Sequence, residues 1–496
     1  MIPRVMDNRL AFFRKGPNMS FTSIIDSINK IVWNNLLVFL CLFTGLLFSI
    51  RLKFPQIRYF KEMVHLLLHQ EGGKDSGITP FQAFATTVGS RVGMGSVAGV
   101  ATGIYFGGPG AIFWMWILGI LGAVSAMAES MLAQAYKDKV NGEYIGGPAL
   151  FIEKGLKCKP YAVIFALATI LGPGILMPGL HANSLASTFQ RAFGLNMIIG
   201  GIILSFFLAL VTFGGVKRIG SFAEKAAPIM CLVYMLMALG VLVIYWRNLP
   251  SVFYDIFTSA FGVNAAFGGI AGSAIIWGVK RGVYSTEAGQ GSGAIVSAAA
   301  DCTHPVKQGL IQALSVYIVA FIVCTSTAVI LLLSKSYNVI GPDGSTFIVE
   351  YLPGSPYGVG WTQDILEHIY GDLIGGKLFA IIITLFIFTS LIGYSYQAES
   401  NVNYLFKGNK VAITVMRVIF VLSTFSGVLV NGEVVWTMGD TGAGCMAWLN
   451  IVAILLLSKT VIKLMKDYEQ QKKEGKDPVF NPAQFGIEDK TGAWKL

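Results

Sequence analysis

Long apolar stretches dominate the chain, and short polar connections separate them. A helix that crosses a membrane needs about 20 consecutive apolar residues, and about eleven stretches approach that length. They lie at residues 31–50, 80–106, 110–136, 161–180, 194–215, 226–246, 262–300, 308–334, 376–396, 411–431 and 442–465. The pattern therefore predicts an all-α polytopic membrane protein with about eleven transmembrane helices.

Several segments depart from this pattern and are predicted to lie outside the membrane. Residues 55–69 are amphipathic, which is typical of a helix at the membrane interface, within a cytoplasmic loop over residues 51–79. Residues 335–375 are polar and contain glycine, proline and acidic residues, so we expect an external loop. Residues 1–30 form an N-terminal segment, and residues 466–496 form a cytoplasmic tail.

The composition supports the membrane class. Hydrophobic residues make up 54% of the chain and charged residues only 13%, whereas a soluble protein carries about a quarter charged residues. The formal net charge of +10 does not indicate nucleic-acid binding, because the basic residues lie in short loops and the tail. The six cysteines and five histidines show neither disulfide nor metal spacing.

The basic residues also predict the orientation. They concentrate after the first, third, fifth and ninth apolar stretches and in the tail, while the alternate loops are nearly free of them. Such loops stay on the cytoplasmic side, so we expect an external N-terminus and a cytoplasmic C-terminus in a prokaryotic cytoplasmic membrane. Arg4, Arg9, Arg14 and Lys15 oppose this arrangement. We therefore expect translation to start at Met19, which removes them.

Glycine-rich interruptions occur in two of the apolar stretches, at residues 80–106 and 262–300. Each interrupted stretch opens a set of five, over residues 80–246 and 262–465, and the stretch at residues 31–50 stands in front of both sets. Matching breaks in the first helix of two five-helix sets are typical of inverted-repeat transporters, whose binding site lies at the breaks.

Broken helices need a partner for their backbone. Each N–H or C=O group freed inside a membrane costs several kcal/mol if nothing binds it. A substrate carboxylate can accept from the N–H groups, and a cation can bind the carbonyl groups. The candidate positions are Gly89, Arg91, Gly93 and Gly95 in the first break and Ser285, Thr286 and Glu287 in the second. Gly99, Gly103 and Gly122 suit close helix packing instead.

Several motifs resemble those of a known family. VGMGSVAGVA (92–101), GGPGAIFWMW (107–116), WGVKRGVYSTEAGQGS (277–292) and VVWTMGDTGAGCMAWLN (434–450) are similar to the motifs of the alanine/glycine:cation symporters, also called the sodium:alanine symporter family. The resemblance covers nearly everything from the first apolar stretch to the tail. It implies the inverted-repeat fold of sodium-coupled leucine transporters, with one extra helix in front.

The resemblance also implies the substrate site. The amides around Gly93, Met94 and Gly95 would hold the substrate carboxylate, and Ser90 would lie beside the amino group. The full set that it implies is Ser90, Gly93, Met94, Gly95, Ser96, His181, Tyr284, Ser285, Thr286, Ser390 and Tyr394. For His181 and Tyr394, ordinary buried structural roles stay open as alternatives.

A Na⁺ site is implied beside the first break. By the resemblance, the carbonyl groups of Gly89 and Val92 and the hydroxyl groups of Thr389 and Ser390 coordinate the ion, and Ser96 contributes to a second position. Adjacent hydroxyl residues in an apolar helix also suit Na⁺ on their own chemistry. The alternative is that both hydroxyls bond to carbonyls of their own helix, which is common.

Three positions depart from the family pattern. Ser96 and Thr286 each stand where the family has Asn, and Met94 stands where it has Thr. Serine reaches less far than asparagine toward a cation, and methionine makes the pocket narrower and more apolar. The substrate range and the coupling ion can therefore differ from the family's usual alanine, glycine and Na⁺.

Charged residues inside apolar stretches need partners. We expect Glu129 to form a structural ion pair with a lysine or arginine. Asp440 is expected to cap the last apolar stretch. Arg91 is expected to neutralise Glu287 across the two breaks.

Taken with the resemblance, these features predict a symporter that imports a small neutral amino acid (alanine, glycine or D-alanine) coupled to Na⁺. A proton-coupled transporter, or one selective for glutamine or serine, remains an alternative within the same fold. The sequence lacks the GxSxG and HExxH enzyme motifs, the phosphate-binding loop of a pump and a filter-like channel repeat. Membrane enzyme and channel are therefore more remote alternatives, and no obligate protein partner is indicated.

Overall fold

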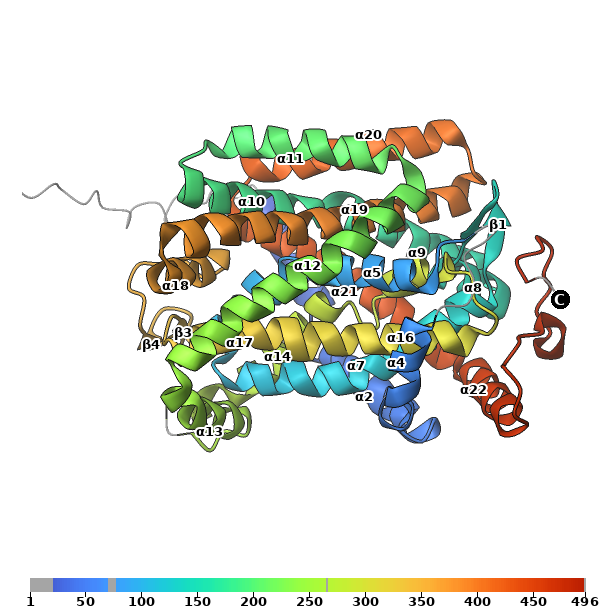
Figure 1. The fold of residues 1–496 in the computed structure, drawn as a ribbon, viewed down its shortest axis with the longest axis horizontal. Coiled ribbons are helices and arrows are strands. Elements are labelled where there is room, and N and C mark those ends of the chain that lie inside the picture. Colours follow the sequence, from blue (N-terminus) through green and yellow to red (C-terminus); the bar gives the residue numbers. More distant parts are fainter. Residues whose placement is uncertain (1–20, 70–76, 265, 495–496) are drawn as a thin grey trace, which may run out of the picture.

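A computed structural model describes residues 21–69, 77–264 and 266–494 (Figure 1). Within them the chain is almost entirely helical, and two short antiparallel hairpins are the only sheets. The all-α prediction is confirmed. The expected translation start at Met19 lies outside the described residues.

Helices cover each predicted apolar stretch, and further helices lie between and after these stretches. They are α1 (Phe21–Val32), α2 (Asn35–Arg51), α3 (Pro55–Arg58), α4 (Phe60–Leu68), α5 (Pro80–Arg91), α6 (Val100–Gly107), α7 (Gly110–Ala135), α8 (Pro148–Gly155), α9 (Lys159–Leu171), α10 (Pro178–Phe193), α11 (Met197–Thr212), α12 (Gly215–Ile244), α13 (Leu249–Ala260), α14 (Ala271–Thr286), α15 (Ser292–Ala298), α16 (Pro305–Tyr317), α17 (Thr325–Leu333), α18 (Val359–Gly371), α19 (Phe379–Phe406), α20 (Lys410–Ser426), α21 (Gly432–Leu456) and α22 (Ser458–Lys473). π-Helical segments lie at Gly95–Gly99, Gly172–Leu176, Ile318–Cys324 and Asp372–Leu378.

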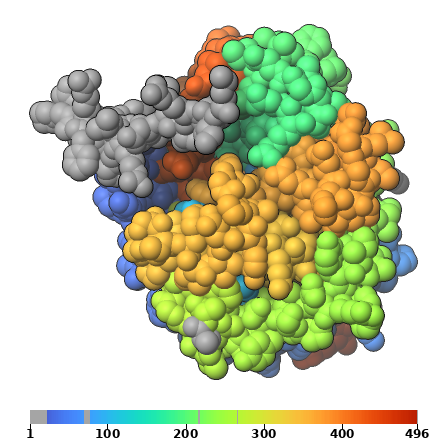
Figure 2. All heavy atoms as spheres, turned by 90° about the vertical axis from the view of Figure 1, so that its left-hand side faces the viewer, coloured from blue at the N-terminus to red at the C-terminus, as the bar shows by residue number. Residues whose placement is uncertain are grey.

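Most long helices run between two ends of the molecule (Figure 1). We call one the hairpin end, where β3 (Asn338–Ile340) and β4 (Phe347–Glu350) lie with α13 and α18. We call the other the tail end, where β1 (Asp138–Val140) and β2 (Glu143–Ile145) lie with α8, α22 and the C-terminus. Figure 2 looks onto the hairpin end, which α13, the β3–β4 hairpin and α18 largely cover.

The sides of the bundle are apolar. Outward-facing residues of α11, α12 and α20 include Ile202, Phe206, Leu236 and Leu422, each more than half exposed. A soluble protein rarely exposes so continuous an apolar surface. Lipid is its natural surrounding, so the chain is a multi-pass membrane protein.

Among the described residues, seven helices are long and apolar enough to cross a membrane, or up to eight if the bent pair α1–α2 counts as one span. This number of spanning helices is lower than the expected eleven. One reason is that α11 has only 16 residues, and another is that two predicted spans are broken into short helices. The total of eleven therefore stays a prediction.

Two boundaries differ from expectation. The last predicted stretch, residues 442–465, is two elements, α21 and α22, and α21 begins ten residues earlier, after an Asn431 side-chain cap. The predicted loop at residues 335–375 folds into the β3–β4 hairpin and α18. In the hairpin turn, Asp343 accepts hydrogen bonds from the backbone and side chains of Thr346 and Ser345, which lower the pKa of its carboxyl group.

The C-terminal tail packs on the tail end rather than extending from it. The amide of Phe480 donates to the carbonyl of Thr303 (2.9 Å), and Lys307 forms an ion pair with Asp477 (2.6 Å). Trp494 is buried against the ring of Phe480. The tail therefore covers the connection between α15 and α16.

Candidate functional site

The first break separates α5 from α6. α5 begins with a capping box, in which the Thr79 hydroxyl accepts from the Gln82 amide and the Gln82 side chain accepts from the Thr79 amide. It ends at Arg91, and Val92 then leaves helical geometry with ψ 64°. The chain resumes as the π-helical segment Gly95–Gly99. The predicted break in this helix is confirmed.

Two amides in this break have no protein acceptor. Within the described part of the chain, the N–H groups of Gly93 and Met94 donate no hydrogen bond, although both residues are buried. Buried N–H groups are rarely left unpaired, and free amides at a helix break form an anion site. The break thus presents two donors to an anionic group.

Carbonyl groups of the same break are bound by hydroxyls from other helices. Ser285 Oγ donates to the carbonyl of Gly95 (2.7 Å), and Thr327 Oγ1 donates to the carbonyl of Ser96 (2.7 Å). Tyr234 Oη lies 2.7 Å from the same Thr327 hydroxyl. The sequence prediction included Ser285 but missed Thr327, although Thr327 ends a run of three hydroxyl residues (325–327) in an apolar stretch, a local signal that could have found it.

The second break begins at Glu287, the last of its three predicted positions. The other two, Ser285 and Thr286, still belong to α14, which stays helical to Thr286. The helix then ends because Glu287, Gly289 and Gly291 all have positive φ (52°, 84° and 82°), a conformation that glycine adopts readily. Thr286 Oγ1 donates back to the carbonyl of Gly282 within its own helix (2.7 Å).

The structure brings the predicted hydroxyl pair to the first break. Thr389 Oγ1 and Ser390 Oγ donate to the carbonyl of Gly89 at 3.1 and 3.0 Å. Both hydroxyls also lie within hydrogen-bond distance of the carbonyl of Phe386 in their own helix (3.0 and 2.9 Å). No hydrogen bond joins the Val92 carbonyl to either hydroxyl in the described chain. The hydroxyl pair is therefore hydrogen-bonded to the Gly89 carbonyl, while the role of Val92 stays a prediction.

His181 and Tyr394 close another side of the first break. A Cβ atom added at Gly93 would lie 2.8 Å from His181 Nε2 and would also collide with the Ser390 hydroxyl. His181 Nδ1 lies 3.3 Å from the carbonyl of Met177, so Nδ1–H donates there and Nε2 faces Gly93 as an acceptor. The ring of Tyr394 packs edge-on against His181, at 5.2 Å between centroids.

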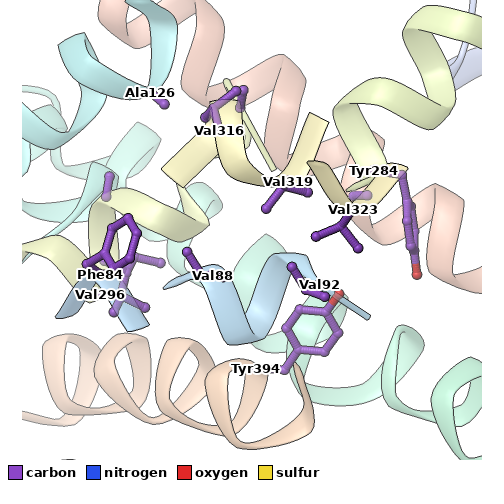
Figure 3. Close-up of a cluster of buried hydrophobic side chains, with 14 of the residues drawn as sticks. Phe84, Val88, Val92, Ala126, Tyr284, Val296, Val316, Val319, Val323 and Tyr394 are labelled. Carbon is purple, nitrogen blue, oxygen red and sulfur yellow. The ribbon is translucent and has the colours of Figure 1, made fainter. Parts of the chain in front are cut away.

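The packing beneath the break is apolar. Figure 3 shows Val92 beside Tyr394, with Val319 and Val323 on its other side. All four residues are buried. These apolar contacts hold the end of α5 in place.

Asp440 is not a helix cap. It lies inside α21, where Lys280 Nζ is 2.8 Å from its Oδ2 and Arg281 binds the same oxygen. The side chains of Lys280, Arg281 and Asp440 are only 9%, 1% and 6% exposed. The cap prediction was wrong because the charge partner is 159 positions away along the chain.

Two cavities at the hairpin end lie above this ion cluster. One of about 350 Å³ is lined by Lys280, Arg281 and Asp440 with Trp277 and Trp436. The other, of about 370 Å³, also touches Trp436 and extends to Ala98 in the π-helical segment. The second cavity therefore reaches the π-helical segment that follows the first break.

Two predicted ion pairs do not form. Glu129 accepts from the Asn450 side chain (2.6 Å) and the Gly291 amide (3.2 Å) and, in the described chain, has no basic side chain within ion-pair distance. Arg91 does not pair directly with Glu287, because its guanidinium donates to Ser315 Oγ instead. Uncharged polar groups near or on α15, α16 and α21 bond to Arg91 and Glu129, in place of the charged partners that the sequence suggested.

Comparison with known proteins identifies relatives over nearly the whole chain. Residues 18–482 match the model described as the sodium:alanine symporter family. The putative sodium/proton-dependent alanine carrier protein YrbD of Bacillus subtilis is 44% identical over 94% of this chain and 96% of its own. The probable sodium/glutamine symporter GlnT of the same organism is 41% identical, covering 92% of each chain.

A solved structure supports the architecture. The crystal structure of MhsT in complex with L-phenylalanine aligns with a TM-score of 0.54 over 79% of this chain and 99% of MhsT, at 13% identity. This likeness shows the fold. It agrees with the two helices that break at matching positions in the two repeats.

Proposed function

Because the chain belongs to the sodium:alanine symporter family, we propose that it imports a small neutral amino acid together with Na⁺ by alternating access. Alanine, glycine and D-alanine are the proposed substrates. One observation carries the proposal: the free amides of Gly93 and Met94 lie in the same break as the Gly89 carbonyl and its two hydroxyl partners. The proposed anion site and the proposed cation site are therefore adjacent in this break.

The substrate fits this break as a zwitterion. Its carboxylate accepts from the amides of Gly93 and Met94, with Gly95 beside them. Its ammonium donates to the Ser90 hydroxyl and to His181 Nε2, the free ring acceptor facing Gly93. The space for a side chain is small because Gly95 lies directly against the backbone of Ser285.

The cation site supplies hard oxygen ligands. The carbonyl of Gly89 and the hydroxyls of Thr389 and Ser390 bind Na⁺, and rotating the hydroxyl hydrogens away turns their lone pairs to the ion. Val92 and Ser96 complete the proposed ligand set. Filled together, the two sites neutralise the freed backbone groups and lower the barrier to the inward-facing state.

The proposed orientation places the hairpin end outside the cell and the tail end in the cytoplasm. The cavities open at the hairpin end. At the tail end, Ile78 pairs with Ala300 in a parallel bridge that joins the start of α5 to the end of α15. This arrangement suits a state that loads substrate from outside.

Reconstituted protein provides the direct test. Proteoliposomes with an inward Na⁺ gradient are expected to accumulate labelled L-alanine in a saturable manner, and glycine and D-alanine are expected to compete. Replacing Na⁺ by K⁺ should abolish accumulation. Glutamine competition stronger than that of alanine would favour the selectivity named for GlnT, and uptake driven equally well without Na⁺ would contradict the proposed coupling.

The hydroxyl pair predicts a specific Na⁺ phenotype. Ser390→Ala is expected to raise the Na⁺ concentration for half-maximal uptake about tenfold, equivalent to ~1.4 kcal/mol for one lost ligand. Thr384→Ala is the matched control, because Thr384 lies on the same helix and, among the described residues, its hydroxyl bonds only to the carbonyl of Ala380 in that helix. If both variants show the wild-type Na⁺ dependence, the Ser390 hydroxyl serves only its own helix.

A further inference from the structure

Three charged side chains are buried between the two breaks without forming an ion pair. Arg91 is 1% exposed, and Glu129 and Glu287 are fully buried. Both carboxyl groups lie within electrostatic range of Arg91, yet over the described residues neither carboxyl oxygen comes within ion-pair distance of its guanidinium. With all three ionised, the cluster holds one uncompensated negative charge. Such a charge is strongly unfavourable in a buried, low-dielectric site.

The hydrogen-bond partners of Glu129 favour its ionised form. Its Oε2 accepts from the Asn450 side-chain amide and from the backbone amide of Gly291. Asn450 Nδ2 also donates to the carbonyl of Gly289 (2.9 Å), which fixes the orientation of the amide. Both partners are pure donors, so they stabilise an anion at Glu129.

Glu287 has partners of a different kind. Its Oε2 lies 3.1 Å from Ser90 Oγ and 2.7 Å from Ser292 Oγ, and hydroxyls either donate or accept. Ser90 has one hydroxyl hydrogen and an alternative acceptor, the carbonyl of Thr87 at 3.1 Å. When Ser90 donates to Thr87, its lone pairs receive an O–H from Glu287. A protonated Glu287 is therefore fully compatible with its surroundings.

A proton suits this position better than a metal ion. A bound Na⁺ needs several oxygen ligands, whereas the described chain gives the Glu287 carboxyl group two hydroxyl neighbours, Ser90 and Ser292. The guanidinium of Arg91 also repels a second cation. A proton needs one lone pair and leaves Arg91 balanced by the Glu129 anion.

We propose that Glu287 holds one proton between the two breaks, and that release of this proton is a step of the transport cycle. The charged or titratable groups in electrostatic range of Glu287 are Arg91 on α5, Glu129 on α7, Tyr284 on α14 and Tyr394 on α19. The other polar neighbours in this cluster, on α15, α16 and α21, are the uncharged Ser292, Gln312 and Asn450.

The position of Glu287 links the proton to movement. Its carboxyl group bridges Ser90 at the end of α5 and Ser292 at the start of α15, so both broken helices depend on the same contact. When these helices separate, the Glu287 O–H loses its acceptors and water can take the proton, which leaves the carboxylate. This coupling rests on the proposed amino-acid transport, whereas the proton site itself does not.

Infrared spectroscopy of the purified full-length protein tests the proton site without transport. At neutral pH we expect the C=O band of a buried carboxylic acid, shifted in D₂O. Glu287→Gln should remove the band, while Glu129→Gln should leave it. Glu350→Gln is the control, because Glu350 is exposed on β4. Absence of the band in the wild type, or its persistence in Glu287→Gln, would overturn the proposal.

A transport measurement tests whether the proton on Glu287 takes part in the transport cycle. In proteoliposomes, wild-type alanine uptake should vary with pH, while Glu287→Gln, which mimics the protonated form, should keep alanine exchange but lose the pH dependence. An unchanged pH profile in Glu287→Gln would overturn the coupling step even if the band is lost. If the wild type transports no alanine, the proposed function fails, and the infrared arm still decides the proton site.

Discussion

Replacing Gly95 with alanine is expected to slow transport about 100-fold, while the same change at Gly99 is expected to be tolerated. A Cβ atom at Gly95 would lie 2.9 Å from the Cα atom of Ser285 and 3.0 Å from the ring of Tyr284. A backbone atom of another helix has no room to yield, so the two broken helices must move apart. At Gly99 the nearest atoms are 3.7 Å away, which is ordinary contact.

The expected magnitude follows from the geometry of the break. Overpacking costs about 1–3 kcal/mol, and separating the helices also weakens the bond from Ser285 Oγ to the Gly95 carbonyl. A displacement of about 1 Å in a positioned site can cost roughly 100-fold in rate. We therefore expect Gly95→Ala to lose about 100-fold in uptake rate and Gly99→Ala to stay near wild type.

Initial uptake rates per reconstituted protein measure this effect. Size-exclusion profiles of both variants show whether the protein still folds. If Gly95→Ala folds and transports within twofold of the wild type, close approach of the two breaks is not required for transport.

Neutralising Asp440 is expected to be the most destabilising single change among the ion pairs. Asp440→Asn leaves Lys280 and Arg281 side by side, both buried and both charged. Removing one partner of a buried ion pair typically costs about 3–5 kcal/mol. The aromatic rings of Trp277 and Trp436 over the Arg281 guanidinium offset only part of this cost.

A surface pair provides the matched control. Arg191 and Asp364 are 2.6 Å apart, but their side chains are 36% and 47% exposed, so Asp364→Asn is expected to cost about 0–1 kcal/mol. Thermal unfolding in detergent compares the two variants. The double variant Asp440→Asn, Lys280→Gln should recover part of the loss, because only one buried cation then lacks a counter-charge. Equal melting temperatures for Asp440→Asn and Asp364→Asn would contradict the argument.

The candidate site was predictable where its signal is local. Glycines beside Arg91 predict the first break, because a charge and several helix-weakening residues rarely share an uninterrupted membrane helix. The adjacent hydroxyls of Thr389 and Ser390 are a similar local signal, and the structure places both at Gly89. In the second break the backbone turns at Glu287, one of the three positions predicted from its run of polar residues.

The sequence by itself determined the membrane class, the positions of the long apolar helices and the family, because these depend on apolar length, glycine placement and motifs along one stretch of chain. Only the tertiary structure decided which charges meet. Arg281 binds Asp440 across 159 positions, and Arg91 lies near Glu287 without pairing to it. Burial makes each isolated charge costly, so its partner is chosen by how the helices pack in space, which no local pattern records.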